Sequence, residues 1–187
     1  MAQRFFTKRI ASGLVAGCFG LLVVILGGWW FTFAVGIIVH LALLEFFKMA
    51  EFKGIRPATK TTLLACQLLL VATQLDCSVG LSSDITAAVL PISGAGICCW
   101  LLLQPKTGSI ADIAASIFGL FYLGFLPSHW IKLRNLSDID LSISIKSIQD
   151  PVVILTTGFY LTLITCLMIV ACDIGSYYFG KLYGKHS

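Results

Sequence analysis

Long apolar runs alternate with short polar stretches along the whole chain, and this pattern predicts its architecture. Six runs stand out, near residues 10–26, 31–47, 61–75, 83–103, 110–131 and 151–173. Crossing a bilayer core of about 30 Å takes roughly 20 helical residues, so such runs are typical of transmembrane helices. We therefore expect an all-α, polytopic integral membrane bundle with about six transmembrane helices, forming one membrane domain over residues 1–187.

Turn and break residues separate these runs. The stretch "GGWW" at residues 27–30 predicts a tight turn, with its tryptophans at the depth of an interfacial aromatic belt. Gly54 and Pro57 mark a polar loop between the second and third runs. Pro91 lies inside the fourth run and Pro127 near the end of the fifth, so both helices are expected to bend.

The composition agrees with a membrane protein. Of the 187 residues, 58% are hydrophobic and 12% are charged, whereas soluble domains carry about 25% charged residues. The seven cysteines lack metal-ligand spacing, and we expect them to be small apolar side chains in the thiol form. Neither a phosphate-binding glycine loop nor a nucleic-acid-binding pattern occurs, so we expect no nucleic-acid partner.

Lysine and arginine are distributed unevenly between the two ends of the predicted helices. If every run crosses the membrane, ten of the 13 fall on one side and three on the other. The richer side receives both termini and the loop after the second run. The positive-inside rule therefore predicts a multi-pass protein with both termini in the cytoplasm. A basic cytoplasmic face attracts anionic lipid headgroups and anionic soluble substrates.

An acid near the end of the last run is the main chemical signal. Asp173 comes some twenty residues into that run, and a carboxylate at membrane depth usually marks function. At about 100° per residue, four others lie within about 60° of it on one helical face: Ser176, Tyr177, Gly180 and Gly184. We call these five residues the Asp173 stripe; Lys181 and Lys185 flank it. The stripe could hold a metal ion at the acid and phosphates at the lysines.

Structural explanations of the same residues stay open at this point. Gly180 and Gly184 have the spacing of a helix-packing pattern. The lysines could extend to the membrane interface, and Asp173 could pair with one of them. The other polar residues in the runs give weaker signals. Asp112 is explained by the helix dipole, and His40 is more typical of bundle packing than of a metal ligand.

Three segments carry a family resemblance. The stretch "CDIGSYYFGKLYGKH", residues 172–186, resembles the aspartate block of the phosphatidate cytidylyltransferases, also called CDP-diacylglycerol synthases. Residues 45–57 are similar to the family's loop with the G-x-x-P ending, and residues 116–134 to its Y-x-G-x-L-P segment. The resemblance covers essentially the whole chain, and the sequence of residues 116–134 is similar to that of cyanobacterial and plastid members.

The resemblance implies a reaction and roles for the stripe. Members of the family join CTP and phosphatidic acid into CDP-diacylglycerol and pyrophosphate, and they depend on a divalent metal, usually Mg²⁺. Asp173 would bind the metal directly or through water, and Lys181 and Lys185 would bind phosphates. Four residues would shape the nucleotide pocket: Ser176, Tyr177, Gly180 and Gly184. The setting would be the lipid bilayer of a cell inner membrane or plastid membrane, and a homodimer is left open.

One departure and two alternatives accompany the resemblance. The family's later lysine-rich stretch and its H-G-G-x-x-D-R signature do not occur in these residues. We therefore expect the N-terminal portion of a longer enzyme, which by itself lacks a complete metal site and activity. The alternatives are a CTP-dependent polyprenol or phytol kinase and a small transporter subunit with Asp173 as its ion site.

Overall fold

The computed structural model describes residues 2–79, 85–104, 108–136 and 156–184, and within these ranges it is helical, without strands. The elements are α1 (Ala2–Leu26), α2 (Gly28–Phe52), α3 (Thr59–Val79), α4 (Ile85–Leu103), α5 (Ile110–Phe118), η1 (Gly119–Phe125), α6 (Leu126–Arg134) and α7 (Thr157–Tyr183). Because α5, η1 and α6 form one continuous helix, each predicted run corresponds to one helix. Five of these helices are long and apolar enough to cross a membrane, and α1 contributes a shorter apolar stretch over Val15–Leu26. The predicted all-α polytopic membrane bundle is confirmed.

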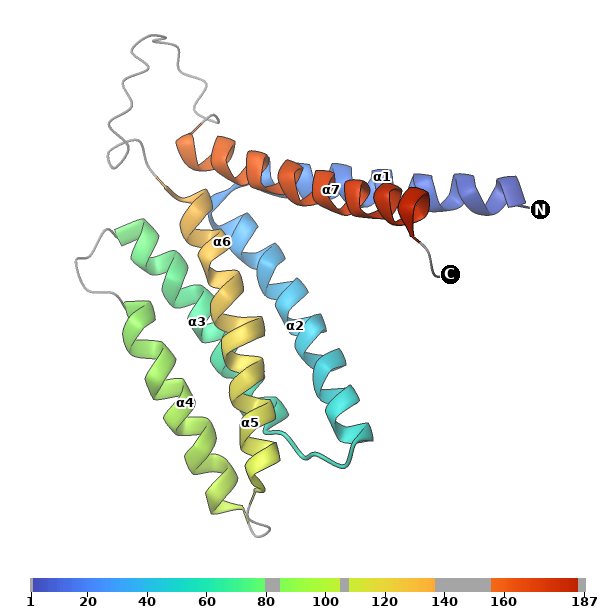
Figure 1. Cartoon of the computed structure of the whole chain (residues 1–187). Helices are drawn as coiled ribbons and strands as arrows, with labels where there is room; N and C mark the ends of the chain where they lie inside the picture. Colours follow the sequence, from blue (N-terminus) through green and yellow to red (C-terminus); the bar gives the residue numbers. More distant parts are fainter. Residues whose placement is uncertain (1, 80–84, 105–107, 137–155, 185–187) are drawn as a thin grey trace.

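Helices α2, α3 and α4 and the continuous α5–η1–α6 helix form the bundle (Figure 1). Its core consists of fully buried side chains from these helices, among them Leu43, Phe47, Cys66, Leu70 and Ile131. Consecutive helices pack on one another because short connections favour antiparallel neighbours. The large apolar side chains on the outer surface of the bundle are exposed, as they are in a protein that faces hydrocarbon.

The α5–η1–α6 helix is wound more loosely over Gly119–Phe125 than an α-helix, as a π-helix. This π segment ends just before Pro127, which lies in the first turn of α6, and the predicted bend at Pro127 stays a prediction. This segment lies close to its neighbours: a Cβ at Gly119 would lie 3.0 Å from the ring of Phe47, and one at Gly124 would lie 2.6 Å from Sγ of Cys66. Glycine is therefore required where the π-helix meets α3.

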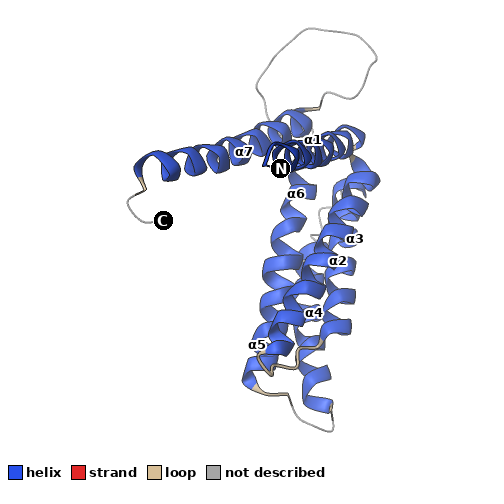
Figure 2. Cartoon of the chain, turned by 90° about the vertical axis from the view of Figure 1, so that its right-hand side faces the viewer, coloured by secondary structure: helices blue, strands red, loops and turns tan. Residues whose placement is uncertain are grey.

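Helices α1 and α7 lie across one end of the bundle, crosswise to its helices (Figures 1 and 2). The turn into α2 is tighter than the sequence predicts, because Trp29 and Trp30 already belong to α2 and Gly27 alone separates it from α1. Gly27 and Gly28 have φ values of +60° and +50°. These left-handed conformations favour glycine, and they let the chain turn sharply between two helices.

Arg134 fixes this junction. Its Nε donates to the carbonyl oxygen of Val24 at 2.8 Å, its Nη1 to Oγ1 of Thr156 at 3.2 Å, and its Nη2 to the carbonyl oxygen of Ile25 at 3.4 Å. Its guanidinium carbon also lies 5.5 Å from the ring centroid of Phe159. The side chain is buried, so one cation joins the end of α1, the end of α6 and the start of α7.

The count of lysine and arginine assumed that all six runs cross the membrane side by side, so that successive loops lie on alternating sides. The crosswise position of α1 and α7 differs from this assumption. The described loop cations Lys53, Arg56 and Lys60 lie at one end of the bundle, and α7 lies across the other (Figure 1). The count uses only apolar length and charge. It could not predict the contacts of Arg134, because these join residues that are far apart in the sequence. The side of the membrane on which the termini lie stays a prediction.

Candidate functional site

Four of the five residues of the Asp173 stripe lie on one helix, as their spacing predicts, but Gly184 does not, because the helix ends at Tyr183 and Gly184 has extended backbone. α7 continues from Thr157 to Tyr183, and Gly184 follows as its C-cap, with its N–H donating to the carbonyl oxygen of Gly180 at 2.9 Å. The hydroxyl of Ser176 donates to the carbonyl oxygen of Asp173 at 2.9 Å. The carboxylate of Asp173 therefore stays available, because this bond uses only its backbone oxygen.

The stripe is open on all sides within the described structure. Only the first half of α7 is packed, and Leu167–Leu182 are exposed except for the half-buried Gly175. Tyr177 has 65% of its surface exposed, and its ring lies edge-on to that of Tyr178, with centroids 5.9 Å apart. The residues that would close a nucleotide pocket around the stripe are not found among the described helices.

The two structural explanations of the stripe can now be compared with the geometry. A Cβ at Gly180 would meet no atom within 4 Å, so the glycine spacing packs against no described helix. In the described ranges Asp173 forms no ion pair, and Lys181 is exposed. Lys185 lies outside the described residues. Open space beside a helical glycine accommodates either a ligand or another helix. Ligand binding at the stripe therefore stays a prediction.

The donor set at Asp173 fits Mg²⁺ only in part. Magnesium is commonly held by one or two carboxylates together with water and substrate phosphates. Asp173 supplies one such carboxylate, and the described residues contain no cluster of three His, Cys, Asp or Glu side chains. Any ion bound there would depend on further oxygens from the substrate or from other parts of the protein.

The α2–α3 loop is a second candidate segment, and it begins with a Schellman motif. The N–H of Gly54, with φ at +80°, donates to the carbonyl oxygen of Glu51 at 2.9 Å, and that of Ile55 donates to the carbonyl oxygen of Ala50 at 3.2 Å. This is the 5→2 and 6→1 pattern that terminates helices at glycine. The sequence prediction of a break at Gly54 is confirmed.

Asp112 and Ser116 of α5 hold this loop in place, a role that the sequence did not predict. One carboxylate oxygen of Asp112 accepts the N–H of Arg56 at 2.6 Å, and the other accepts the N–H of Ser109 at 2.7 Å. The hydroxyl of Ser116 accepts the N–H of Ala58 at 2.9 Å. Both side chains are buried. The loop is therefore fixed to α5, with the side chains of Lys53, Arg56 and Lys60 exposed.

One sequence signal could have indicated part of this arrangement. Ser109 and Asp112 have the three-residue spacing of a capping box, and the structure contains both of its reciprocal hydrogen bonds. That spacing explains the start of α5 but not the bond to Arg56, which lies 56 residues away. Asp112 lies in the first turn of α5, as predicted, but the helix dipole alone does not explain it, because its carboxylate also accepts the N–H groups of Arg56 and Ser109.

The described structure brings two of the three family-like segments together, because the rings of Phe46 and Phe118 lie 5.6 Å apart between their centroids, whereas the α7 segment lies apart from both. Gly124 of the third segment is explained by its close approach to Cys66, and this contact lies within the bundle. The α2–α3 loop lies at one end of the bundle, and α7 lies across the other (Figure 1). The Asp173 stripe and the loop cations are therefore two separate features in the described part of the chain.

Comparisons with known proteins agree with the resemblance seen in the sequence. Residues 7–187 match the model of the cytidylyltransferase family. A phosphatidate cytidylyltransferase of Synechocystis sp. is 39% identical over 189 residues, an alignment that covers 96% of this chain and 62% of the relative. Two chloroplastic phosphatidate cytidylyltransferases of Arabidopsis thaliana, numbers 5 and 4, are each 30% identical and are covered over 47% and 46% of their length.

The chain thus spans less than two thirds of the length of these relatives. No solved structure matches it.

Proposed function

Because the chain belongs to the cytidylyltransferase family, we propose that the protein acts in the transfer of a cytidylyl group from CTP to phosphatidic acid. The products would be CDP-diacylglycerol and pyrophosphate. The proposal is supported chiefly by the Asp173 stripe, which carries an acid, two hydroxyls and Gly180 on one face of an apolar helix, with Gly184 directly after the helix end.

The reaction brings two anions together, and this sets the chemistry that the protein must supply. An oxygen of the lipid phosphate attacks the α-phosphorus of CTP. A new oxygen–phosphorus bond forms, the bond from the α-phosphorus to its bridging oxygen breaks, and pyrophosphate leaves. Positive charge that neutralises the phosphates and a fixed orientation of the two substrates lower the barrier to such a transfer.

We assign the roles in this transfer from charge and position. Asp173 would hold Mg²⁺ together with oxygens of the triphosphate, and the bound ion would neutralise charge on the reacting phosphates. Lys181 and Lys185 would bind phosphate oxygens as cations. Gly180 would admit the nucleotide near the helix, because a Cβ there meets no atom within 4 Å. Ser176 and Tyr177 would contribute hydroxyls to the nucleotide pocket.

The substrates set the location of the reaction. Phosphatidic acid lies in the membrane and CTP in the aqueous phase, so the site must lie at a membrane surface. We place the protein in a cell inner membrane or plastid membrane with both termini on the cytoplasmic side, on the basis of the lysine and arginine count. The exposed cations of the α2–α3 loop would then face anionic headgroups on that side.

A chimaeric enzyme tests the proposed function. Residues 1–187 replace the matching 62% of the Synechocystis relative, and membranes containing the chimaera receive labelled CTP, phosphatidic acid and Mg²⁺. We expect labelled CDP-diacylglycerol, and we expect Asp173→Asn to reduce its formation at least about a hundredfold, in line with the loss of one essential charged group.

Matched controls make the result decisive. Asp76→Asn removes an acid that caps α4 and does not belong to the stripe, and it should leave most of the activity of the correctly inserted chimaera. Insertion of each variant is measured by its amount in the membrane fraction and its monodisperse elution in detergent. A chimaera that inserts normally but makes no CDP-diacylglycerol would contradict the proposal, and so would full activity of the Asp173→Asn variant.

A further inference from the structure

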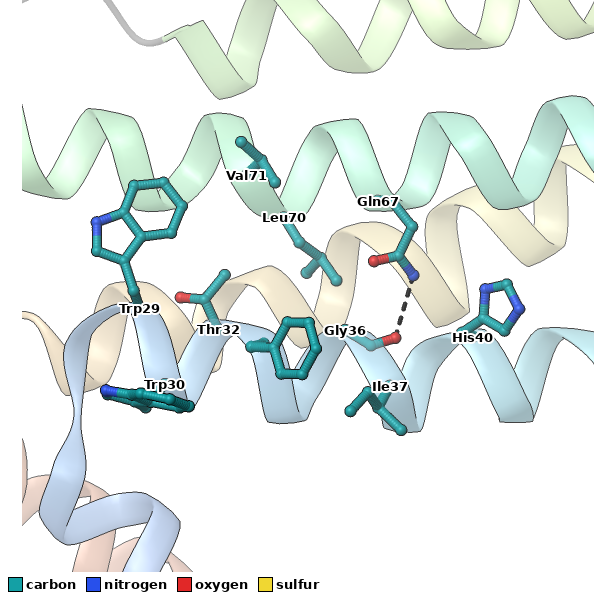
Figure 3. A pocket seen from close by; sticks show the side chains of 10 residues that line it. Trp29, Trp30, Thr32, Gly36, Ile37, His40, Gln67, Leu70 and Val71 are labelled. Atoms are coloured by element: carbon teal, nitrogen blue, oxygen red, sulfur yellow. Dashed lines mark hydrogen bonds between the residues drawn. The ribbon is translucent and has the colours of Figure 1, made fainter.

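A pocket opens between α2 and α3 in the half of the bundle that contains Gly27 (Figure 3). Its volume is about 650 Å³, within the range of sites that bind small molecules. The walls are aromatic and aliphatic side chains: Trp29, Trp30, Phe33, Ile37, Leu70 and Val71. The pocket lies on the outer surface of the bundle, where all of these side chains except the buried Leu70 are exposed.

Between the two ends of the pocket, the polar side chains of Thr32 and Gln67 are paired with protein atoms. Nε2 of Gln67 donates to the carbonyl oxygen of Gly36 at 3.1 Å, as Figure 3 shows. The hydroxyl of Thr32 donates to Oε1 of Gln74 at 2.8 Å, and the same hydroxyl also lies 3.2 Å from the carbonyl oxygen of Gly28. Between its ends the pocket therefore presents mainly hydrocarbon, and polar groups lie at both ends, the indole N–H groups of Trp29 and Trp30 at one and the imidazole of His40 at the other. A ligand without polar groups along its length suits such walls.

The length and depth of the pocket narrow the choice of ligand. Figure 3 shows Trp29 and Trp30 at one end and His40 at the other. These residues are eleven positions apart on α2, which corresponds to about 16 Å along a helix. Half of a hydrocarbon core of about 30 Å is about 15 Å. His40 is also the central residue of α2, Gly28–Phe52, so the pocket extends from the tryptophan end of the helix to its middle.

We propose that this pocket binds one acyl chain of a bilayer phospholipid from the leaflet next to Trp29, with the end of the chain directed toward His40. The proposal rests on the bilayer setting proposed above but not on the cytidylyl transfer. The ligand is a bulk phospholipid, because none of the described residues that line the pocket is a lysine or arginine. Arg134 lies beside Gly27 at this end of α2, but it is buried and donates to protein oxygens. We therefore expect no headgroup selectivity at this site.

Photoactivatable lipids test the orientation of the chain. The 187-residue protein is reconstituted in phosphatidylglycerol vesicles that contain one of two probes, with a diazirine either near the carbonyl or at the terminal carbon of one acyl chain. We expect the first probe to label Trp29–Phe33 and the second to label the surroundings of His40 and Gln67, as read by mass spectrometry of peptides. The reverse order, or equal labelling of both regions by both probes, would overturn the proposal.

Filling the pocket tests its occupancy. Val71→Trp narrows the pocket from α3, and Leu68→Trp adds the same ring to an exposed residue of α3 that does not line it. We expect pocket labelling to fall about tenfold in the first variant, the loss that follows when roughly two methylene groups can no longer be buried. The second variant should label like the unmodified protein. Equal labelling of both variants would contradict the proposal.

A second pair of variants guards against misfolding. Ile37→Trp lines the pocket from α2, and Ile38→Trp, its neighbour outside the pocket, is the control. Helix content by circular dichroism identifies the pair that folds normally.

A separate experiment tests headgroup selectivity. Probes with phosphatidic acid and phosphatidylcholine headgroups should label the pocket equally. Labelling confined to phosphatidic acid would show a substrate subsite and would overturn the assignment to bulk lipid.

Discussion

Single side chains with several hydrogen bonds hold the helix ends of this protein together. Arg134 is the clearest case, because it donates to the last turn of α1 and to the N-cap Thr156 of α7. Carbonyl groups in the last turn of a helix have no intrahelical partner, and a buried guanidinium supplies one. The charged side chain of Arg134 therefore stabilises the junction of α1, α6 and α7.

Replacing Arg134 by methionine should loosen this junction. Hydrogen bonds to charged groups contribute about 1.5 to 3 kcal/mol, so we expect a destabilisation of about 2 to 3 kcal/mol. For a chain of this size the melting temperature should fall by roughly 5 to 10 °C, measured by circular dichroism in detergent. The exposed Lys53→Met variant is the control, with an expected change within about 0.5 kcal/mol. Equal melting temperatures of the two variants would contradict this role for Arg134.

Asp112 should control the order of the α2–α3 loop. In Asp112→Ala the N–H groups of Arg56 and Ser109 lose their acceptor, and we expect a destabilisation of about 1 to 2 kcal/mol. Limited digestion with trypsin reports the loop directly, because Lys53 lies at its start. Cleavage there should become several times faster. The exposed Ser78→Ala variant, which also loses a side-chain hydrogen bond, should be cleaved at the original rate.

The same residues show which contacts could not be predicted from the sequence. The face formed by Asp173, Ser176, Tyr177 and Gly180 was predictable because these residues lie on one helix, whose geometry follows from spacing alone. The prediction was wrong for Gly184, because the helix ends one residue before it. The roles of Arg134 and Asp112 depend on partners 110 and 56 residues away. No local pattern contains such a contact, so the signal was limited to a capping box at Ser109.

At the scale of elements, apolar runs predicted the helices but not their internal form. Crossing length follows from hydrophobicity, which the sequence displays directly. The π-helix of Gly119–Phe125 depends on a shift in hydrogen-bond register, and the shift accompanies the tight packing of Gly124 on Cys66. The sequence contains the glycine and the following proline, but the neighbour that makes the glycine necessary belongs to α3.

A substitution at Gly124 tests this packing. In Gly124→Ala the new methyl group would lie 2.6 Å from Sγ of Cys66, and such overpacking typically costs about 1 to 3 kcal/mol. The double variant with Cys66→Gly removes the obstructing side chain and should recover part of the lost stability. Gly96→Ala is the matched control, since a Cβ there meets no atom within 4 Å and alanine favours a helix by about 1 kcal/mol. Equal melting temperatures of the two alanine variants would contradict the contact.

At the scale of the whole molecule, the position of α7 is the feature least predictable from sequence. Its first half is held by α6 and α1, and its second half is exposed. Apolar length indicates that such a helix enters the membrane but not which helices accompany it. The Asp173 stripe was accordingly predictable as a face, whereas the pocket around it was not, because the described helices do not form its other walls.

The two ends of the bundle give a test of orientation. In a cysteine-free background, we expect Lys53→Cys and Leu182→Cys to react with a membrane-impermeant maleimide from the same side. The reason is that α7 has the length and apolar character to cross a bilayer and that the charge count places both positions in the cytoplasm. Reaction from opposite sides would contradict this topology and would show that α7 stays across the far end of the bundle in the membrane.

The 187-residue chain alone should not catalyse the proposed transfer. One carboxylate and an open helix face supply only part of the charge and orientation that two phosphate-bearing substrates need. We expect no pyrophosphate release above background from the purified chain with CTP, phosphatidic acid and Mg²⁺, while the chimaera with the Synechocystis relative is active. CTP-dependent release by the chain alone would contradict this expectation.

The bond between Arg134 and Val24 also has a consequence for the order of assembly during synthesis. Helices α2, α3 and α4 pack on sequence neighbours, and such local contacts form early. The donor that holds the end of α1 is translated 110 residues after its acceptor, which at about 5 to 20 residues per second means several seconds. During that interval the first helix to leave the ribosome has no anchor at Arg134. We expect its position to become fixed only after the continuous α5–η1–α6 helix, which carries Arg134, has been synthesised.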